Sequence, residues 1–91
     1  MKIEWEPAKQ QANLRKHRLD FADADEIMAG PTFTFEDTRF SYGEQRYITL
    51  GLLRTMIVVI AHTERGEAMR IISMRKATRY EERLFFQSFR E

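Results

Sequence analysis

Basic side chains gather near the C-terminal end of the chain, in a pattern that suits the binding of phosphate. Residues 65–80 contain five basic side chains and one acidic side chain, Glu67. Arg75 and Lys76 end a β-prone segment, and Arg79 lies one helical turn into the next predicted element. Guanidinium groups bind phosphate oxygens in a fixed fork, and a helix N-terminus adds partial positive charge. These three cations predict a phosphate cradle where a strand meets a helix; the alternative is an ordinary solvated basic surface.

Arg70 lies inside the same β-prone segment, residues 68–75, among apolar neighbours. A guanidinium group there needs a partner, because burying an unpaired charge is costly. The partner is either a structural carboxylate or an external phosphate, and the apolar surroundings favour the carboxylate. Side chains alternate between the two faces of a strand, and strict alternation predicts two sets: Met69, Ile71, Ser73 and Arg75 on one face, and Ala68, Arg70, Ile72 and Met74 on the other.

Two histidines are the candidates for proton transfer beside such a cradle. His62 closes the predicted central strand and is expected to face the same end of the sheet as Arg75, where an imidazole can act as general acid or base. His17 ends the first predicted helix beside Lys16, and these two are the second candidates. The alternatives are structural: a core imidazole for His62, and a cap on helix carbonyls for His17. The histidines are 45 residues apart with no third ligand in local spacing, so no metal site is predicted.

Hydrophobic periodicity and capping residues predict the elements that must position these groups. A proline at the first helical position, an Asp20 cap and a capping box at Thr78 and Glu81 mark three helix starts. Consecutive strands favour an α+β fold: an antiparallel sheet of four to five strands with two N-terminal helices and one C-terminal helix, in the order β-α-α-β-β-β-β-α. The predicted strands are 2–5, 32–35, 46–53, 56–63 and 68–75; the helices are 7–17, 21–28 and one from 79 onward; residues 37–43 form a loop.

The predicted C-terminal helix carries more apolar surface than one core face needs. Its stripe at helical spacing is predicted to face the core: Tyr80, Leu84, Phe85 and Phe89. Phe86 is adjacent to Phe85 and points in another direction, so one of the two is expected to be exposed in a monomer and to meet a partner protein or a second copy. Three further aromatic residues are expected in the core rather than as platforms for stacked bases: Trp5, Phe33 and Phe35.

Length and composition limit the class of protein. The chain has 91 residues, of which 43% are hydrophobic and 32% charged, as is typical of one globular domain spanning residues 1–91. It has no cysteine, which excludes disulfide scaffolds, thiolate zinc sites and cysteine nucleophiles. The longest uncharged apolar run, residues 55–62, is too short to cross a bilayer, and no apolar signal core follows Met1. A cytoplasmic protein with no membrane contact is expected.

This set of groups suits RNA as a substrate. RNA carries its own nucleophile, the 2′-OH, so a small enzyme needs only an aligned base, cations on the pentavalent phosphate and an acid for the leaving oxygen. Neither a metal nor another cofactor is predicted. The alternative function is a non-catalytic basic module for nucleic acid or an acidic partner protein, which would bind with steep salt dependence and leave its ligand chemically unchanged.

Three blocks of the sequence resemble the BrnT family of toxins. The N-terminal pattern Trp-Asp/Glu-x-x-Lys, Asn-x-x-Lys-His and Phe-x-x-Ala is met by eight residues: Trp5, Glu6, Lys9, Asn13, Lys16, His17, Phe21 and Ala24. A strand pattern Glu-x-Arg-x-x-x-x-Gly is met at Glu44, Arg46 and Gly51, and the most recognisable block covers residues 62–83. Arg18 departs from the family, which usually has Gly there, and the C-terminal tail has no distinctive match.

The resemblance implies the toxin of a type II toxin–antitoxin pair, with a fold similar to RelE-like ribonucleases and an endoribonuclease activity that stops translation. It also implies a cognate BrnA-like antitoxin with a ribbon-helix-helix DNA-binding part. Toxin and antitoxin together would repress their own operon, commonly as a heterotetramer, with operator DNA reached only through the antitoxin.

Two sets of residues are predicted for this activity. The catalytic set would hold the scissile phosphate, stabilise the transition state or move a proton: His62, Arg65, Arg75 and Arg79. The RNA-binding set would contact phosphates or orient the catalytic groups: Lys16, His17, Arg70, Ser73 and Lys76.

Overall fold

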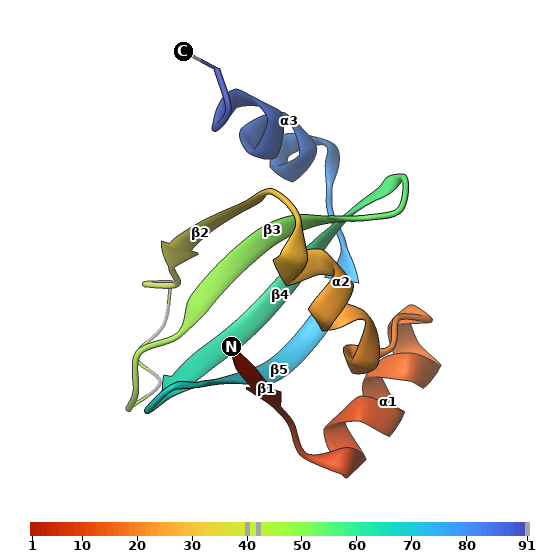
Figure 1. The fold of residues 1–91 in the computed structure, drawn as a ribbon, viewed down its shortest axis with the longest axis vertical. Coiled ribbons are helices and arrows are strands. Elements are labelled where there is room, and N and C mark those ends of the chain that lie inside the picture. The colour runs from red at the N-terminus through yellow and green to blue at the C-terminus, as the bar shows by residue number, and fades with distance from the viewer. Residues whose placement is uncertain (40, 42, 91) are drawn as a thin grey trace.

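The computed structural model describes residues 1–39, 41 and 43–90. Its strands form one five-stranded sheet in the order β1-β5-β4-β3-β2 (Figure 1). The strands are β1 (Lys2–Glu4), β2 (Thr32–Glu36), β3 (Tyr47–Leu53), β4 (Met56–Arg65) and β5 (Ala68–Lys76). The helices are α1 (Pro7–His17), the 3-10 turn η1 (Phe21–Asp23), α2 (Ala24–Ala29) and α3 (Arg79–Gln87). Residues 40 and 42 of the predicted loop 37–43, and residue 91, lie outside the described part.

The predicted α+β class and element order are confirmed. β2, β3, β4 and β5 pair antiparallel in succession, whereas β1 pairs with β5 in parallel. A parallel neighbour requires a crossover connection. Here the crossover is nearly the whole chain, because β1 is the first element and β5 the last strand. None of the described helices is long and apolar enough to span a membrane.

Each face of the sheet carries its own hydrophobic core. One face, called here the α1–α2 face, is covered by the segment from Leu19 through η1 to α2, and α2 lies across the front of the sheet in Figure 1. α1 itself lies at the edge of β5. At Gly51 of β3 a Cβ atom would collide with Ile27, so glycine allows α2 to lie close against the strand. The α3 face has a smaller core, in which Phe85 and Ala77 pack on β3 and β4.

Local signals set the helix ends. α1 begins at Pro7, as predicted, because proline fits the first helical position. Asp20 accepts a hydrogen bond from the turn that it caps, but the helix predicted at 21–28 begins as η1 and continues as α2. Thr78 and Glu81 form the predicted capping box. These agreements concern contacts between residues only a few positions apart.

Asn13 fastens α1 to the edge of β5. Its buried side chain accepts a hydrogen bond from the Met74 N–H at 3.0 Å and donates one to the Leu19 carbonyl at 3.0 Å. β1 covers this edge only at residues 68–70. Beyond residue 70, Asn13 therefore supplies a hydrogen-bond partner to the edge of β5, and α1 covers this edge, which would otherwise be open.

A β-bulge in β5 reverses the alternation of its side chains. Ala61 of β4 pairs with Ser73, but the next residue, His62, pairs with Ile71, which leaves Ile72 without a partner in the ladder. One extra residue in a strand shifts every later side chain to the other face. The strict alternation predicted for residues 68–75 is therefore wrong beyond the bulge.

The bulge changes the face on which the candidate site residues of β5 lie. Met69 and Ile71 lie in the core of the α1–α2 face, as does Met74 beyond the bulge. Ser73 and Arg75 lie on the α3 face instead, because directly paired residues in a sheet share a face and Arg75 pairs with Val59 of that core.

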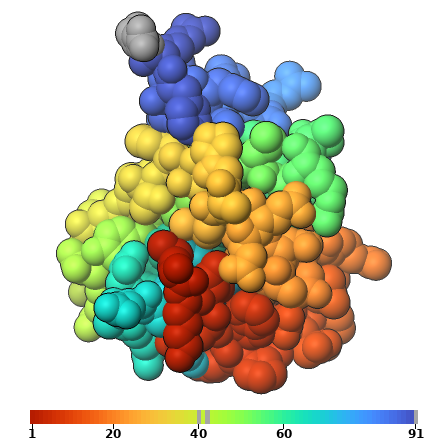
Figure 2. Space-filling model, viewed as in Figure 1, coloured from red at the N-terminus to blue at the C-terminus, as the bar shows by residue number. Residues whose placement is uncertain are grey.

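α3 packs on the sheet over a short length only. Phe85 is 3% exposed, whereas Tyr80 is 67% and Phe89 50% exposed, so the predicted core stripe is wrong at its two ends. The reason is position: α3 extends away from the rest of the molecule, at the top of Figure 2. Phe86 is 60% exposed, which confirms that one of the two adjacent phenylalanines is exposed.

Replacing Asn13 by Ala should lower the free energy of unfolding by roughly 1–3 kcal/mol, because the substitution leaves buried polar backbone groups without a partner. Urea denaturation followed by circular dichroism measures the change. Gln11→Ala, on an exposed position of the same helix, is the control and should leave stability nearly unchanged. Equal stabilities of the two variants would contradict the role given to Asn13.

Candidate functional site

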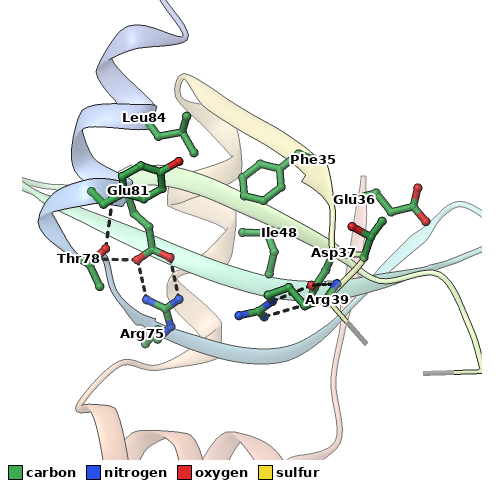
Figure 3. A pocket seen from close by; sticks show the side chains of 11 residues that line it. Phe35, Glu36, Asp37, Arg39, Ile48, Arg75, Thr78, Glu81 and Leu84 are labelled. Carbon is green, nitrogen blue, oxygen red and sulfur yellow. Dashed lines mark hydrogen bonds and ion pairs between the residues drawn. The ribbon is translucent and has the colours of Figure 1, made fainter. Parts of the chain in front are cut away.

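A cleft of about 380 Å³ opens between α3, β2 and the end of β5 (Figure 3). Phe35, Ile48 and Leu84 form an apolar wall, and the guanidinium group of Arg75 lies on the opposite side. We call it the Arg75 cleft. Among the described residues, its lining is Phe35, Glu36, Asp37, Thr38, Arg39, Ile48, Arg75, Thr78, Tyr80, Glu81 and Leu84.

Arg75 is held in this cleft by a two-pronged ion pair with Glu81. Its Nη1 and Nη2 donate to the two carboxylate oxygens of Glu81 at 2.7 and 2.8 Å. Glu81 also accepts a hydrogen bond from the Thr78 N–H at 2.8 Å, which belongs to the capping box of α3. The hydrogen bonds from Arg75 lower the pKa of Glu81 to about 2, and the same pairing raises the pKa of Arg75. Both groups are therefore charged at neutral pH.

Arg39 supplies a second guanidinium group to the Arg75 cleft. Its Nε and Nη2 donate to Asp37 at 2.8 and 3.0 Å, and the Asp37 side chain is only 4% exposed. Arg39 and Arg75 line the same cleft, and the charge of Arg39 acts against the rise in the pKa of Arg75. Sequence reasoning missed Arg39 because it lies in a predicted loop; the Asp-x-Arg spacing was the only local signal.

A second cleft, of about 250 Å³, lies between α1 and the edge of β5. It brings together three residues of the predicted RNA-binding set, Lys16, His17 and Ser73. We call it the α1 cleft. The described residues that line it are Lys9, Ala12, Asn13, Lys16, His17, Ile72 and Ser73.

His62 lies on the other face of the sheet from Arg75. It is 2% exposed, and its Nε2 is hydrogen-bonded to Thr49 Oγ1 at 2.7 Å. Its Nδ1 is buried and has no hydrogen-bond partner within the described residues. Burial lowers the pKa of His62. The expectation that His62 and Arg75 face the same end of the sheet is wrong, because antiparallel pairing sets His62 against Ile71, near the start of β5, and Arg75 against Val59. The bulge also puts the two side chains on opposite faces.

The remaining predicted residues are not gathered in either cleft. Arg70 forms ion pairs with Glu4 at 3.8 Å and Glu6 at 3.1 Å, which confirms the structural carboxylate as its partner. Lys76 pairs with Val58 and so points to the opposite face from Arg75. The exposed Arg65 and Arg79 line neither cleft. The cradle predicted from Arg75, Lys76 and Arg79 is thus represented in the Arg75 cleft by Arg75 alone.

The aromatic residues divide between core and cleft. Trp5 packs edge-on against Phe21, with ring centroids 6.1 Å apart, and Phe33 packs against the core of the α3 face, as predicted. Phe35 is 37% exposed and lines the Arg75 cleft, so its expected place in the core is wrong. Phe35 and the exposed Tyr80 give this cleft two aromatic surfaces beside two guanidinium groups, a combination that suits a nucleotide.

A comparison with protein families finds one matching family model, described as the ribonuclease toxin, BrnT, of a type II toxin–antitoxin system, over residues 5–81. The matched segment contains all lining residues of the α1 cleft and all but Leu84 of the Arg75 cleft. No curated protein matches the chain.

Glu81→Gln should reduce the free energy of unfolding at pH 7 by roughly 1.5–3 kcal/mol, because it removes charged hydrogen bonds to Arg75. The pKa of Glu81 is about 2 in the folded protein and 4.5 in the unfolded chain. Its stabilisation is therefore complete above pH 4.5 and is lost as the pH falls toward 2. Urea denaturation at several pH values should show wild type and variant converging in acid. Glu82→Gln, in the same helical turn and without an ion pair in the described residues, should show no comparable loss at pH 7.

His62 should make the protein less stable as the pH falls below about 6.5. Its folded pKa lies below its unfolded value of 6.5, so the unfolded chain binds more protons in this range. The stabilisation is complete above pH 6.5 and declines as the pH falls toward the folded pKa. Thermal denaturation between pH 8 and 5 should show a steeper decline for wild type than for His62→Gln. Parallel curves would contradict the assignment to His62.

Proposed function

The chain belongs to the BrnT family, the ribonuclease toxins of type II toxin–antitoxin systems, and from this premise we propose that it cleaves RNA in the Arg75 cleft. The observation that carries the proposal is the pair of guanidinium groups, Arg75 and Arg39, that face one space beside Phe35 and Tyr80. The guanidinium groups suit a phosphate and the aromatic rings suit the attached bases.

Both guanidinium groups are positioned before the substrate arrives. Arg75 is fixed by Glu81, and Arg39 is fixed by the buried Asp37. Donors whose direction is already fixed need little reorganisation to stabilise developing negative charge. In the proposed reaction the ribose 2′-oxygen attacks the adjacent phosphorus as the bond from phosphorus to the 5′-oxygen breaks, and the departing oxygen takes a proton from water. Arg75 and Arg39 bind the non-bridging oxygens as their charge increases. The products are a 2′,3′-cyclic phosphate and a free 5′-hydroxyl. The proposed reaction uses no metal and no other cofactor.

We assign the removal of the 2′-OH proton to Glu81. Its carboxylate lies in the same cleft and is bound to the cation that would hold the phosphate. A carboxylate with a pKa of about 2 is a weak base. A phosphate that competes for Arg75 weakens the ion pair, which raises the pKa of Glu81 toward its ordinary value and makes it a better base. His62 has no part in this proposal, because it is buried on the opposite face.

The outlying cations of the predicted sets receive supporting roles. Arg79 begins α3 beside the Arg75 cleft and Arg65 ends β4, and both are exposed. We assign them, with Lys76, to phosphates beyond the scissile one. Arg70 remains bound to Glu4 and Glu6 and acts on the site through the position of β1 and β5.

A type II toxin is paired with an antitoxin. We propose a BrnA-like antitoxin with a ribbon-helix-helix part that carries the complex to operator DNA, commonly as a heterotetramer, in the cytoplasm where the RNA is. The exposed Phe86 of α3 is the residue expected to meet the antitoxin or a second toxin copy, since a large exposed aromatic group marks an interaction surface.

Purified protein should cleave a labelled mixed-sequence RNA in EDTA and leave 2′,3′-cyclic phosphate ends. Arg75→Gln and Arg39→Gln should each reduce the cleavage rate on the order of a hundredfold, because each removes a donor to the transition state. Glu81→Gln should reduce the rate and change its pH profile. Gel electrophoresis of the products gives the rates and the end chemistry.

Arg54→Gln is the matched control, since Arg54 is an exposed arginine that pairs with Asp23 and Glu26 outside both clefts. It should cleave RNA like the wild type. Circular dichroism spectra confirm that each variant is folded. RNA that stays intact both alone and on ribosomes would contradict the proposal and favour the non-catalytic binding module; cleavage only on ribosomes would make the toxin ribosome-dependent.

A further inference from the structure

The α1 cleft is lined by a single stripe of α1. Lys9, Lys16 and His17 lie seven and eight positions apart along the helix, with Ala12 and Asn13 between them. Positions spaced by three, four and seven residues share one helix face. The helix face next to a sheet is usually apolar. Here it carries cations at both ends and a small side chain at its centre, which leaves the space of the cleft.

The positive charge of the α1 cleft is not neutralised inside the protein. Lys9, Lys16 and His17 have no ion pair with any carboxylate in the described part of the chain. The Arg75 cleft differs, because its two arginines are paired with Glu81 and Asp37. The Arg75 cleft therefore offers directed donors with little net charge, and the α1 cleft offers net positive charge.

Stabilisation of α1 itself does not account for this pattern. Lys16 and His17 lie in the last helical turn, where cations are favourable. Lys9 lies in the first turn, which has no acidic residue and where a cation is unfavourable. Lys9 thus adds positive charge to the cleft but lowers the stability of the helix. A ligand of negative charge explains Lys9 and Lys16 together.

The bulge of β5 supplies the other wall. Ile72 and Ser73 both line the α1 cleft, and the Ser73 hydroxyl makes no hydrogen bond within the described residues. Ser73 lies two residues from Arg75, about 7 Å along the strand. The two clefts are therefore neighbours across the edge of β5, and one extended chain of phosphates can reach both.

We propose that the α1 cleft is a second phosphate subsite, which binds an RNA backbone phosphate beyond the scissile one. The inference rests on the proposed function, because it takes the Arg75 cleft as the place of cleavage. Lys9 and Lys16 supply charge, and the Ser73 hydroxyl donates a hydrogen bond to a phosphate oxygen. In this proposal the RNA crosses the edge of the sheet at β5. The α1 cleft increases the affinity for RNA, and the Arg75 cleft cleaves it.

The test measures binding with labelled 2′-O-methyl RNA, which lacks the free 2′-OH nucleophile and cannot be cleaved by this route. Fluorescence anisotropy gives the Kd of a dinucleotide and an octanucleotide over a range of NaCl concentrations. Wild type should bind the octanucleotide more tightly than the dinucleotide. Lys9→Gln/Lys16→Gln should abolish most of this advantage. It should also lower the slope of log K against log salt by about 1.4, since each contact to single-stranded nucleic acid contributes about 0.7.

The matched control is Lys2→Gln/Arg15→Gln, which removes two charges from exposed positions outside both clefts. It should retain the wild-type slope and length dependence. An equal fall in the control would overturn the proposal, because net charge alone would then explain binding. An unchanged slope in Lys9→Gln/Lys16→Gln would overturn it as well.

Cleavage of unmodified RNA by the wild type is measured separately. RNA that stays intact both alone and on ribosomes would overturn the proposed cleavage, whereas a selective loss of length-dependent binding in Lys9→Gln/Lys16→Gln would still support RNA binding at the α1 cleft. Successful cleavage with unaltered binding in Lys9→Gln/Lys16→Gln removes the subsite alone.

Discussion

Alternation of side chains along β5, and its single interruption at Ile72, determines where the two clefts of this protein lie. Before the bulge β5 contributes Met69 and Ile71 to the core of the α1–α2 face; after it, Arg75 passes to the α3 face. A regular strand would place Arg75 under the helices, where a guanidinium group is costly to bury. The bulge avoids this cost and also exposes Ser73 to the α1 cleft. Both clefts thus depend on one extra residue.

The sequence was sufficient to predict the elements and their order, because their signals are local: Pro7 begins a helix and Thr78 caps another within one turn. It was not sufficient to predict the bulge. Ile72 is as β-prone as its neighbours, and only the pairing with β4 shows that it has no partner. The bulge put Arg75 on the face opposite His62, and the antiparallel register of β4 and β5 separated the two residues along the strands. Arg39 was missed for another reason: its partnership with Asp37 is local, but its nearness to β5 depends on the tertiary fold.

The cations of this chain fall into two classes with different uses. Arg39, Arg70 and Arg75 are each paired with carboxylates, and an arginine held in this way keeps a defined direction. Lys9 and Lys16 are unpaired within the described residues and lie on flexible stems. A lysine acts as a point charge and tolerates many ligand positions, whereas a paired arginine selects one. A net charge of +1 conceals this division, because the paired groups cancel in the sum.

The contacts that join α1 and β1 to β5 link residues far apart in the chain: Asn13 and Met74 are 61 positions apart, and Glu6 and Arg70 are 64. During synthesis on a ribosome the N-terminal elements emerge first but have no surface to pack on until β5 follows. The α1 cleft needs both partners, and the Arg75 cleft also needs α3. A growing chain therefore has no α1 cleft until β5 has been translated, and no Arg75 cleft until α3 has followed. The order of the elements therefore couples the formation of both clefts to the synthesis of β5, the last strand of the sheet.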